Sequence, residues 1–252
     1  MRPVLIDLGG IEIPSYGLLL TLSFVVAFWY VRRKAPGFGI SPVTIENLAF
    51  YVMIGVIIGG RVLYAAFHWH QYQNDILGIF RIWEGGMMFF GSFLGGFLLG
   101  ALYISKQKLA ILKMSDLVAP ALGLGLFLTR LGCFLNGCCF GEPSTVPWAV
   151  RFPAECVAGT SPVGALSLHP VQLYESIFGL ALFFFLNKQV GRTSRQGAVF
   201  AQFLISYGVF RFGVDFIRYF ENSANYWVNQ LIALGLVVAG IIILVKPARK
   251  SI

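Results

Sequence analysis

Three arginines lie inside segments that are otherwise apolar: Arg61, Arg130 and Arg211. A charged side chain at the centre of a membrane helix costs about 2.5–3.5 kcal/mol, so three without partners would cost about 8–10 kcal/mol. Few acids are available inside these segments, and Glu46 and Asp116 lie near segment ends. Structural ion pairing is the alternative, but the shortage of acids favours a bound anion, because guanidinium groups recognise phosphate and carboxylate through paired hydrogen bonds.

The segment around Arg211 places several polar side chains on one helix face. Residues three or four positions apart share a face of a helix. That spacing relates four residues: Tyr207, Arg211, Asp215 and Arg218. Asp215 can orient one of the two arginines and leave the other for a ligand. Arg61 and Tyr64 share a face of another segment in the same way.

Two further blocks combine polar groups with small residues or helix boundaries. In the block from Arg130 to Gly141, glycines make room for a bulky group beside Asn136, whose amide can bind a phosphate or ester oxygen. A simple glycine-rich helix exit is the alternative. The second block places His169 at the start of an apolar segment, one short stretch before Glu175. A histidine there serves either as a helix cap or in proton transfer.

Four cysteines lie close together in the sequence: Cys133, Cys138, Cys139 and Cys156. They lack the paired C-x-x-C spacing that is typical of zinc sites. We therefore favour structural thiols or one disulfide, with a metal site as the less favoured alternative.

The elements that position these residues follow from composition. Of the 252 residues, 57% are hydrophobic and 12% are charged, against about 25% charged residues in soluble domains. A membrane helix needs about 20 mostly apolar residues. We predict an all-α integral membrane protein with seven transmembrane helices, at Ile13–Val31, Glu46–His68, Gly85–Ser105, Met114–Gly137, Pro170–Asn187, Ala198–Phe216 and Tyr226–Val245.

Basic residues set the predicted orientation. Short clusters follow every odd helix: Arg32, Arg33 and Lys34; Lys106, Lys108 and Lys113; Lys188, Arg192 and Arg195; Lys246, Arg249 and Lys250. Positively charged loops face the cytoplasm, so we expect the N-terminus outside and the C-terminus inside. We treat residues 1–252 as one polytopic membrane domain, with residues 138–168 as a small outer head between the fourth and fifth helices. Because the net charge of +8 is spread over such clusters, it does not indicate nucleic-acid binding.

Six motifs together resemble the bacterial prolipoprotein diacylglyceryl transferase family, along almost the whole chain. They are Tyr16-Gly17, Gly59-Gly60-Arg61 with Tyr64, Trp83-Glu84-Gly85-Gly86-Met87, Arg130-Leu-Gly with Asn136-Gly137 and Gly141, His169-Pro with Gln172-Leu-Tyr-Glu175, and Tyr207-Gly-Val-Phe-Arg211. The resemblance implies a seven-helix enzyme of the bacterial inner membrane with a periplasmic head. It also implies transfer of the diacylglyceryl group of phosphatidylglycerol to the lipobox cysteine thiol of preprolipoproteins, forming a thioether and releasing glycerol phosphate.

The resemblance implies no metal and no soluble cofactor, and it implies roles for individual residues. Arg130 and Arg211 would bind and stabilise the phosphate. The substrate site would further include Tyr16, Arg61, Tyr64, Asn136, Gly141, Glu175, Tyr207 and Arg218. Many members carry a histidine where this chain has Phe90, and a phenyl ring accepts no proton. The general base is then His169, a carboxylate or water.

Two rival functions fit parts of the pattern. A catalytically altered homologue would bind an anionic phospholipid or a lipopeptide without transferring its lipid, and Phe90 would be a trace of that change. A transporter of an anionic solute would need a polar path to the cytoplasmic side, and the inner halves of the helices are too apolar for one.

Overall fold

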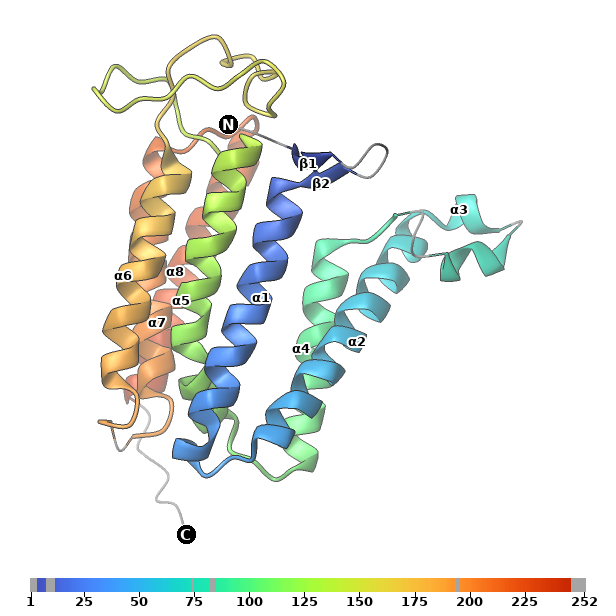
Figure 1. The fold of residues 1–252 in the computed structure, drawn as a ribbon, viewed down its shortest axis with the longest axis vertical. Coiled ribbons are helices and arrows are strands. Elements are labelled where there is room, and N and C mark those ends of the chain that lie inside the picture. The colour runs from blue at the N-terminus through green and yellow to red at the C-terminus, as the bar shows by residue number, and fades with distance from the viewer. Residues whose placement is uncertain (1–3, 8–11, 74, 82–84, 194, 246–252) are drawn as a thin grey trace. The chain divides into compact units, whose positions relative to one another are not determined.

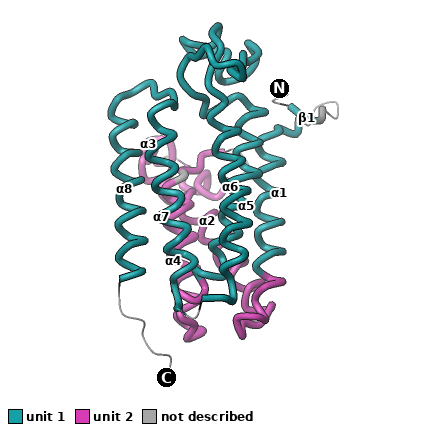
Figure 2. The backbone as a smooth tube through the Cα atoms, turned by 90° about the vertical axis from the view of Figure 1, so that its left-hand side faces the viewer, with its two compact units in different colours: residues 1–31, 115–252 teal, residues 32–114 magenta. Residues whose placement is uncertain are grey.

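The computed structural model describes residues 4–7, 12–73, 75–81, 85–193 and 195–245. Two of the motif residues, Trp83 and Glu84, lie outside the described residues, as does the basic cluster of Lys246, Arg249 and Lys250. The chain forms two compact units (Figure 2). The first contains residues 1–31 and 115–252, and the second contains residues 32–114.

The first unit is a bundle of long helices. They are α1 (Ser15–Lys34, whose last residues belong to the second unit), α5 (Ile111–Asn136, which begins there), α6 (Val171–Gln189), α7 (Ala198–Val214) and α8 (Ser223–Val245). These helices run alongside one another, and residues 138–168 cover one end of the bundle (Figure 1). A short hairpin of β1 (Val4–Asp7) and β2 (Glu12–Pro14) precedes α1, which departs from the all-α prediction.

Small residues let these helices approach closely, as in many membrane bundles. A Cβ on Gly123 of α5 would lie 2.9 Å from the Gly179 carbonyl oxygen of α6, and a Cβ on Gly179 would meet the Gly123 oxygen at the same distance. On α7, a Cβ on Gly208 would lie 2.7 Å from the Ala233 oxygen of α8. These contacts hold α5 backbone to backbone against α6, and α7 against α8.

Residues 138–168 form a small compact segment without helices. Three isolated β-bridges join parts of this segment to one another and to the residue after the short helix η4 (Asp215–Ile217), which follows α7. They are Gly141 with Arg218, Pro143 with Leu168, and Val150 with Leu168. Its interior is a cluster of buried apolar side chains: Phe140, Phe152, Ala158 and Leu168. A core of its own explains how a loop of this length keeps one shape.

The second unit is built on one helix pair, α2 (Pro42–Phe67) and α4 (Phe89–Lys106), with the short elements η1 (Ala35–Phe38), α3 (Trp69–Tyr72) and η2 (Ile76–Phe80). Gly55 and Gly59 on α2 face Gly91 and Gly95 on α4 so closely that a Cβ at any of the four would clash with the opposite backbone. This contact leaves most of the large apolar side chains of α2 exposed on the outside of the pair.

Each of the seven predicted segments is a helix in the structure: α1, α2, α4, α5, α6, α7 and α8. Among the described residues, five helical stretches are long and apolar enough to cross a membrane: 15–38, 42–67, 111–136, 198–217 and 223–245. Helix α4 is apolar but falls short of the required length. Helix α6 is long enough, but it carries Glu175 and Lys188 and is not apolar enough. A helical protein that crosses a membrane several times is therefore confirmed.

Candidate functional site

A single buried carboxylate gathers three arginines in the first unit. Glu175 on α6 is fully buried. Its Oε2 forms an ion pair with Nε of Arg130 on α5. Its Oε1 accepts hydrogen bonds from Arg211 at 3.0 Å and from Arg218 at 3.1 Å. Three guanidinium groups, one from α5 and two from the end of α7 and the residues that follow it, therefore meet around one acid. We call Arg130, Glu175, Arg211 and Arg218 the arginine cluster.

Arg211 has two further partners. Its Nη2 lies 3.1 Å from Asp215 Oδ1, one turn along the chain. The same Nη2 donates a hydrogen bond to Asn229 Oδ1 on α8 at 3.1 Å. The Asn229 amide is in turn oriented by a 2.7 Å hydrogen bond to the Asn225 carbonyl. The sequence analysis missed Asn229; its polar side chain within the apolar stretch of α8 was the available signal.

The cluster carries excess positive charge and unused donors. Three guanidinium groups face two carboxylates, Glu175 and Asp215, which leaves one net positive charge. Both terminal amino groups of Arg130 lack a hydrogen-bond partner within the described part of the chain, as do Nε and Nη2 of Arg218. The side chains of Arg130 and Arg218 are 16% and 13% exposed. The arrangement can therefore accept a singly charged anion from the side on which these two arginines are exposed.

Gly141 lies where the head segment packs against the residues that follow α7. Its N–H donates to the His169 carbonyl at 3.0 Å, and the next N–H, of Glu142, donates to the Ile217 carbonyl at 2.9 Å. A Cβ on Gly141 would lie 2.6 Å from both the Ile217 oxygen and the His169 Cβ. Gly141 also bridges to Arg218. Its part in the site is close packing that holds Arg218 in place, since it has no side chain to offer a ligand.

Three thiols converge at the exit of α5. The sulfur atoms of Cys133, Cys138 and Cys139 all lie within 4.8 Å of one another, and all three cysteines are free. Hydrogen bonds from the Cys133 and Cys138 thiols, and the nearby Arg218 and Arg130, lower the pKa of Cys139. The pKa of Cys138 is raised overall. Its hydrogen bond with Cys133 lowers this pKa, but the hydrogen bond with Cys139 and burial raise it by more.

Cys156 lies apart from these three thiols, packed against Gly137. Burial raises the pKa of Cys156. The expectation of structural thiols therefore fits Cys156, which is also free.

Three other predicted residues lie around the arginine cluster. Tyr16, at the start of α1, lies within electrostatic range of Arg130 and the three clustered thiols, and its backbone packs on Gly132 of α5. Tyr207 on α7 lies within electrostatic range of Arg130. The Asn136 side chain, at the end of α5, interacts with the Cys138 thiol. Two hydroxyls thus lie near Arg130, and the Asn136 amide lies beside the thiols.

His169 belongs to a different hydrogen-bonded chain. Its Nδ1 lies 3.2 Å from the Tyr174 hydroxyl, which accepts a 2.6 Å hydrogen bond from Trp148 Nε1 of the head segment. Among the described residues, no hydrogen bond or ion pair joins His169 to the arginine cluster. The backbone carbonyl of His169 accepts the hydrogen bond from Gly141, and Gly141 in turn bridges to Arg218 of the cluster.

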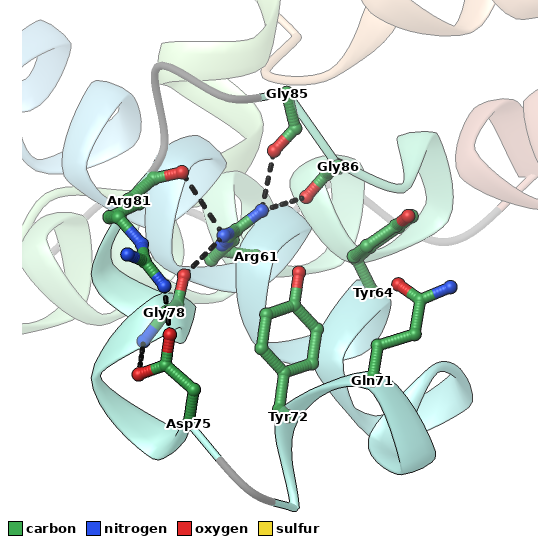
Figure 3. Close-up of a pocket in the computed structure, with 9 residues that line it drawn as sticks. All are labelled: Arg61, Tyr64, Gln71, Tyr72, Asp75, Gly78, Arg81, Gly85 and Gly86. Carbon is green, nitrogen blue, oxygen red and sulfur yellow. Dashed lines mark hydrogen bonds and ion pairs between the residues drawn. The ribbon is translucent and has the colours of Figure 1, made fainter.

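The second unit holds Arg61 and Tyr64 in a site of its own. The guanidinium of Arg61 donates to five backbone carbonyls: Ile79, Gly85, Gly86, Gly78 and Arg81 (Figure 3). The rings of Tyr64 and Tyr72 lie 5.9 and 5.4 Å from its Cζ. Arg61, both tyrosines and four of the five carbonyl-bearing residues (Gly78, Arg81, Gly85 and Gly86) line a cavity of about 290 Å³. Every donor of Arg61 is used to hold the loop after α3, so Arg61 acts here as a brace.

Comparison with known proteins decides the family. A sequence profile of prolipoprotein diacylglyceryl transferases matches residues 3–246. The chain belongs to the prolipoprotein diacylglyceryl transferase family. It is similar to the phosphatidylglycerol–prolipoprotein diacylglyceryl transferase of Chromohalobacter salexigens, with 36% identity over 99% of this chain and 94% of that protein. The proteins of the same name from Escherichia coli O1:K1 and Shigella boydii serotype 18 are each 34% identical over the same shares.

Membership in this transferase family favours an enzyme over the rival lipid-binding protein. Of the site residues expected from the family resemblance, the structure brings Arg130, Glu175, Arg211 and Arg218 into direct contact. It places Tyr16 and Tyr207 within electrostatic range of Arg130 and Asn136 beside the Cys138 thiol, and it places Gly141 as a spacer. Arg61 and Tyr64 lie in the other compact unit, and His169 contacts Tyr174.

Proposed function

We propose that this protein transfers the diacylglyceryl group of phosphatidylglycerol to the lipobox cysteine thiol of preprolipoproteins. The products are a thioether-linked lipoprotein precursor and glycerol phosphate. The names of its relatives state phosphatidylglycerol and prolipoprotein, and no metal or soluble cofactor takes part in the proposed reaction.

The observation that carries the proposal is the charge balance of the arginine cluster. The phosphodiester of phosphatidylglycerol has one negative charge, and the cluster has one uncompensated positive charge. The unused donors of Arg130 and Arg218 are suited to its two free phosphate oxygens. Glu175 and Asp215 supply enough negative charge to hold the guanidinium groups together without filling the site.

The chemistry is a substitution at carbon. The acceptor sulfur attacks C3 of the diacylglyceryl moiety, a C–S bond forms, and the C–O bond to the phosphate breaks with its electron pair on oxygen. Charge then increases on the departing phosphate, where Arg130 and Arg218 donate and Arg211, braced by Asp215 and Asn229, maintains the positive potential. The thiol proton passes to a base, for which we propose His169. Tyr16, Asn136 and Tyr207 border the lipid glycerol.

The same proposal includes the membrane arrangement. We place all seven long helices across a bacterial inner membrane and treat both units as one membrane domain. Helix α4 is apolar although short, and the buried acid of α6, Glu175, is paired with arginines. In the first unit, the basic connection between α6 and α7 lies at the opposite end of the bundle from the head segment (Figure 1). With the basic end in the cytoplasm, residues 138–168 and the arginine cluster face the periplasm and the N-terminus lies outside.

The test is transfer to a lipobox peptide in vesicles of phosphatidylglycerol, read by mass spectrometry of the thioether and by release of glycerol phosphate. Removal of one donor to a developing charge typically lowers turnover by about 10²–10³. We expect at least that loss for Arg130→Ala and for Arg211→Ala. Arg151→Ala is the matched control, because Arg151 lies exposed in the head segment. Full activity in both cluster variants refutes the assignment, and binding of phosphatidylglycerol without any glycerol phosphate release in the wild type supports a binding protein instead.

The role of His169 is tested separately. If it is the base, His169→Gln slows transfer by about 10²–10⁴ and leaves the affinity for phosphatidylglycerol unchanged. Tyr174→Phe removes the hydroxyl that contacts Nδ1 and lowers the rate by a smaller factor, since the imidazole stays. A normal rate in His169→Gln shows that another group takes the proton.

A further inference from the structure

The three sulfur atoms at the exit of α5 are placed as one group. A single disulfide needs two sulfur atoms, and the third could then point elsewhere. Here Cys133, Cys138 and Cys139 each have their sulfur within 4.8 Å of both others, and all are thiols. This mutual convergence is the arrangement that one shared ligand requires.

The backbone is shaped to produce that convergence. Adjacent side chains on an extended chain point in opposite directions, so Cys138 and Cys139 would normally diverge. Cys139 has a φ of +60°, one of two positive φ values at non-glycine residues in the described part of the chain. A left-handed conformation costs about 1–3 kcal/mol at a non-glycine residue and is concentrated at functional sites. At Cys139 it turns the sulfur towards those of Cys133 and Cys138.

The surrounding hydrogen bonds hold the turn in place. The N–H of Cys138 donates to the Cys133 carbonyl at 3.0 Å. Gln172, which is fully buried, donates from Nε2 to the Cys138 carbonyl at 2.8 Å. The N–H of Ala158 in the head segment donates to the Gly137 carbonyl at 2.9 Å. Three thiols on a fixed backbone lose little conformational entropy when they take up a ligand.

We propose that Cys133, Cys138 and Cys139 form a three-thiolate site for a soft metal ion, with Zn²⁺ as the divalent example. Thiolates are the ligands that such ions select. A Zn–S distance of about 2.3 Å in tetrahedral geometry corresponds to sulfur atoms about 3.8 Å apart, so the thiols must contract by about 1 Å at most. Zn²⁺ binds the three sulfur atoms as thiolates, any proton still on a thiol is released to solvent, and the fourth coordination position is left to a water molecule.

The charges nearby suit such a centre. Three thiolates and one divalent ion have a net charge of −1, and Arg218 and Arg130 lie close enough to Cys139 to act on it electrostatically. The sequence pattern alone argued against metal, because the three cysteines are separated by four residues and by none. The site goes beyond the proposed transfer reaction, and no step of that reaction passes through it.

The test uses the full-length chain in detergent, reduced and stripped of metal. Zn²⁺ titration against a chromophoric chelator is expected to show one tight equivalent. Co²⁺ in its place is expected to give the strong near-ultraviolet absorption of sulfur-to-cobalt charge transfer. Cys133→Ser, Cys138→Ser and Cys139→Ser should each weaken Zn²⁺ binding at least about tenfold, which is the lower end of the loss for an outer partner alone. Cys156→Ser is the matched control and should bind like the wild type.

A second measurement needs no variant, in case a serine substitution prevents folding. Zn²⁺ is expected to protect the clustered cysteines of the wild type from N-ethylmaleimide, as read by peptide mass spectrometry, and a chelator to restore their labelling. Absence of a tight equivalent, or equal loss in Cys156→Ser, overturns the site. A disulfide between two of the three cysteines in protein isolated without reductant overturns it as well. Because the readout is metal binding, failure here leaves the transfer assay unaffected, and the reverse holds.

Discussion

Glu175 on α6 accepts a 3.0 Å hydrogen bond from Arg211 on α7, although the two residues are 36 positions apart in sequence. Both side chains are buried, at 1% and 9% exposure. The pairing explains how a helix of an apolar bundle tolerates an arginine: the charge is neutralised by an acid of the neighbouring helix, and the same acid serves two more arginines.

Glu175→Gln should therefore destabilise the protein as well as disable it. The change leaves three buried or half-buried guanidinium groups with Asp215 as their remaining carboxylate, and breaking a buried ion pair costs about 3–5 kcal/mol. We expect that loss in the free energy of unfolding in detergent, together with lost transfer activity. Glu46→Gln is the control, because its ion pair with Arg32 is largely exposed and worth about 0–1 kcal/mol. Equal stability of the two variants would show that Glu175 does not hold the cluster.

Gly141→Ala should displace the chain segment that carries Arg218. The new Cβ has no space between the Ile217 oxygen and the His169 Cβ, and both neighbours are backbone or close to it. Overpacking of this kind costs about 1–3 kcal/mol, so we expect a lower unfolding midpoint and weaker phosphatidylglycerol binding. Gly235→Ala on α8 has open space around its Cβ and should be neutral or stabilising. Normal binding in Gly141→Ala would contradict the spacer role.

Arg61→Lys should loosen the loop after α3. A lysine ammonium has three donors and no planar fork, so it cannot replace the five bonds of the guanidinium. Hydrogen bonds of charged groups contribute about 1.5–3 kcal/mol each, and we expect amide hydrogen exchange at residues 76–81 to accelerate at least about tenfold. Arg32→Lys, at an exposed ion pair, should leave that exchange unchanged. Unchanged exchange in Arg61→Lys would argue against the brace.

The clustered thiols should differ in their response to pH. A thiolate reacts with alkylating reagents and a thiol does not. Because the pKa of Cys139 is lowered, its labelling in reduced, metal-free protein should stay nearly constant as pH falls from about 9 to about 6. Because the pKa of Cys138 is raised, its labelling should fall about tenfold per pH unit. Parallel pH profiles for the two residues, measured by peptide mass spectrometry, would contradict this assignment.

The sequence by itself determined the helices, and from it we predicted an anion site. Apolar segments of membrane length and helical spacing are local properties, so α1, α5 and α8 could be predicted without any contact information. The pair of Arg211 and Asp215 was also predictable, since residues four apart on a helix are neighbours. Arg130 of α5 was recognisable in the same local way, as an arginine within an apolar segment.

Only the tertiary structure decided which groups meet. Sequence spacing gives no distance between helices, so the sharing of Glu175 by Arg130, Arg211 and Arg218 depends on how α5, α6 and α7 pack. The use of Arg61 as a loop brace, in the other unit, depends on where five carbonyls point. The three thiols converge because one residue, Cys139, adopts a left-handed backbone conformation. The spacing that places residues on one helix face is a local property of the sequence. Which side chains contact each other depends on helix packing and on single turns of the backbone.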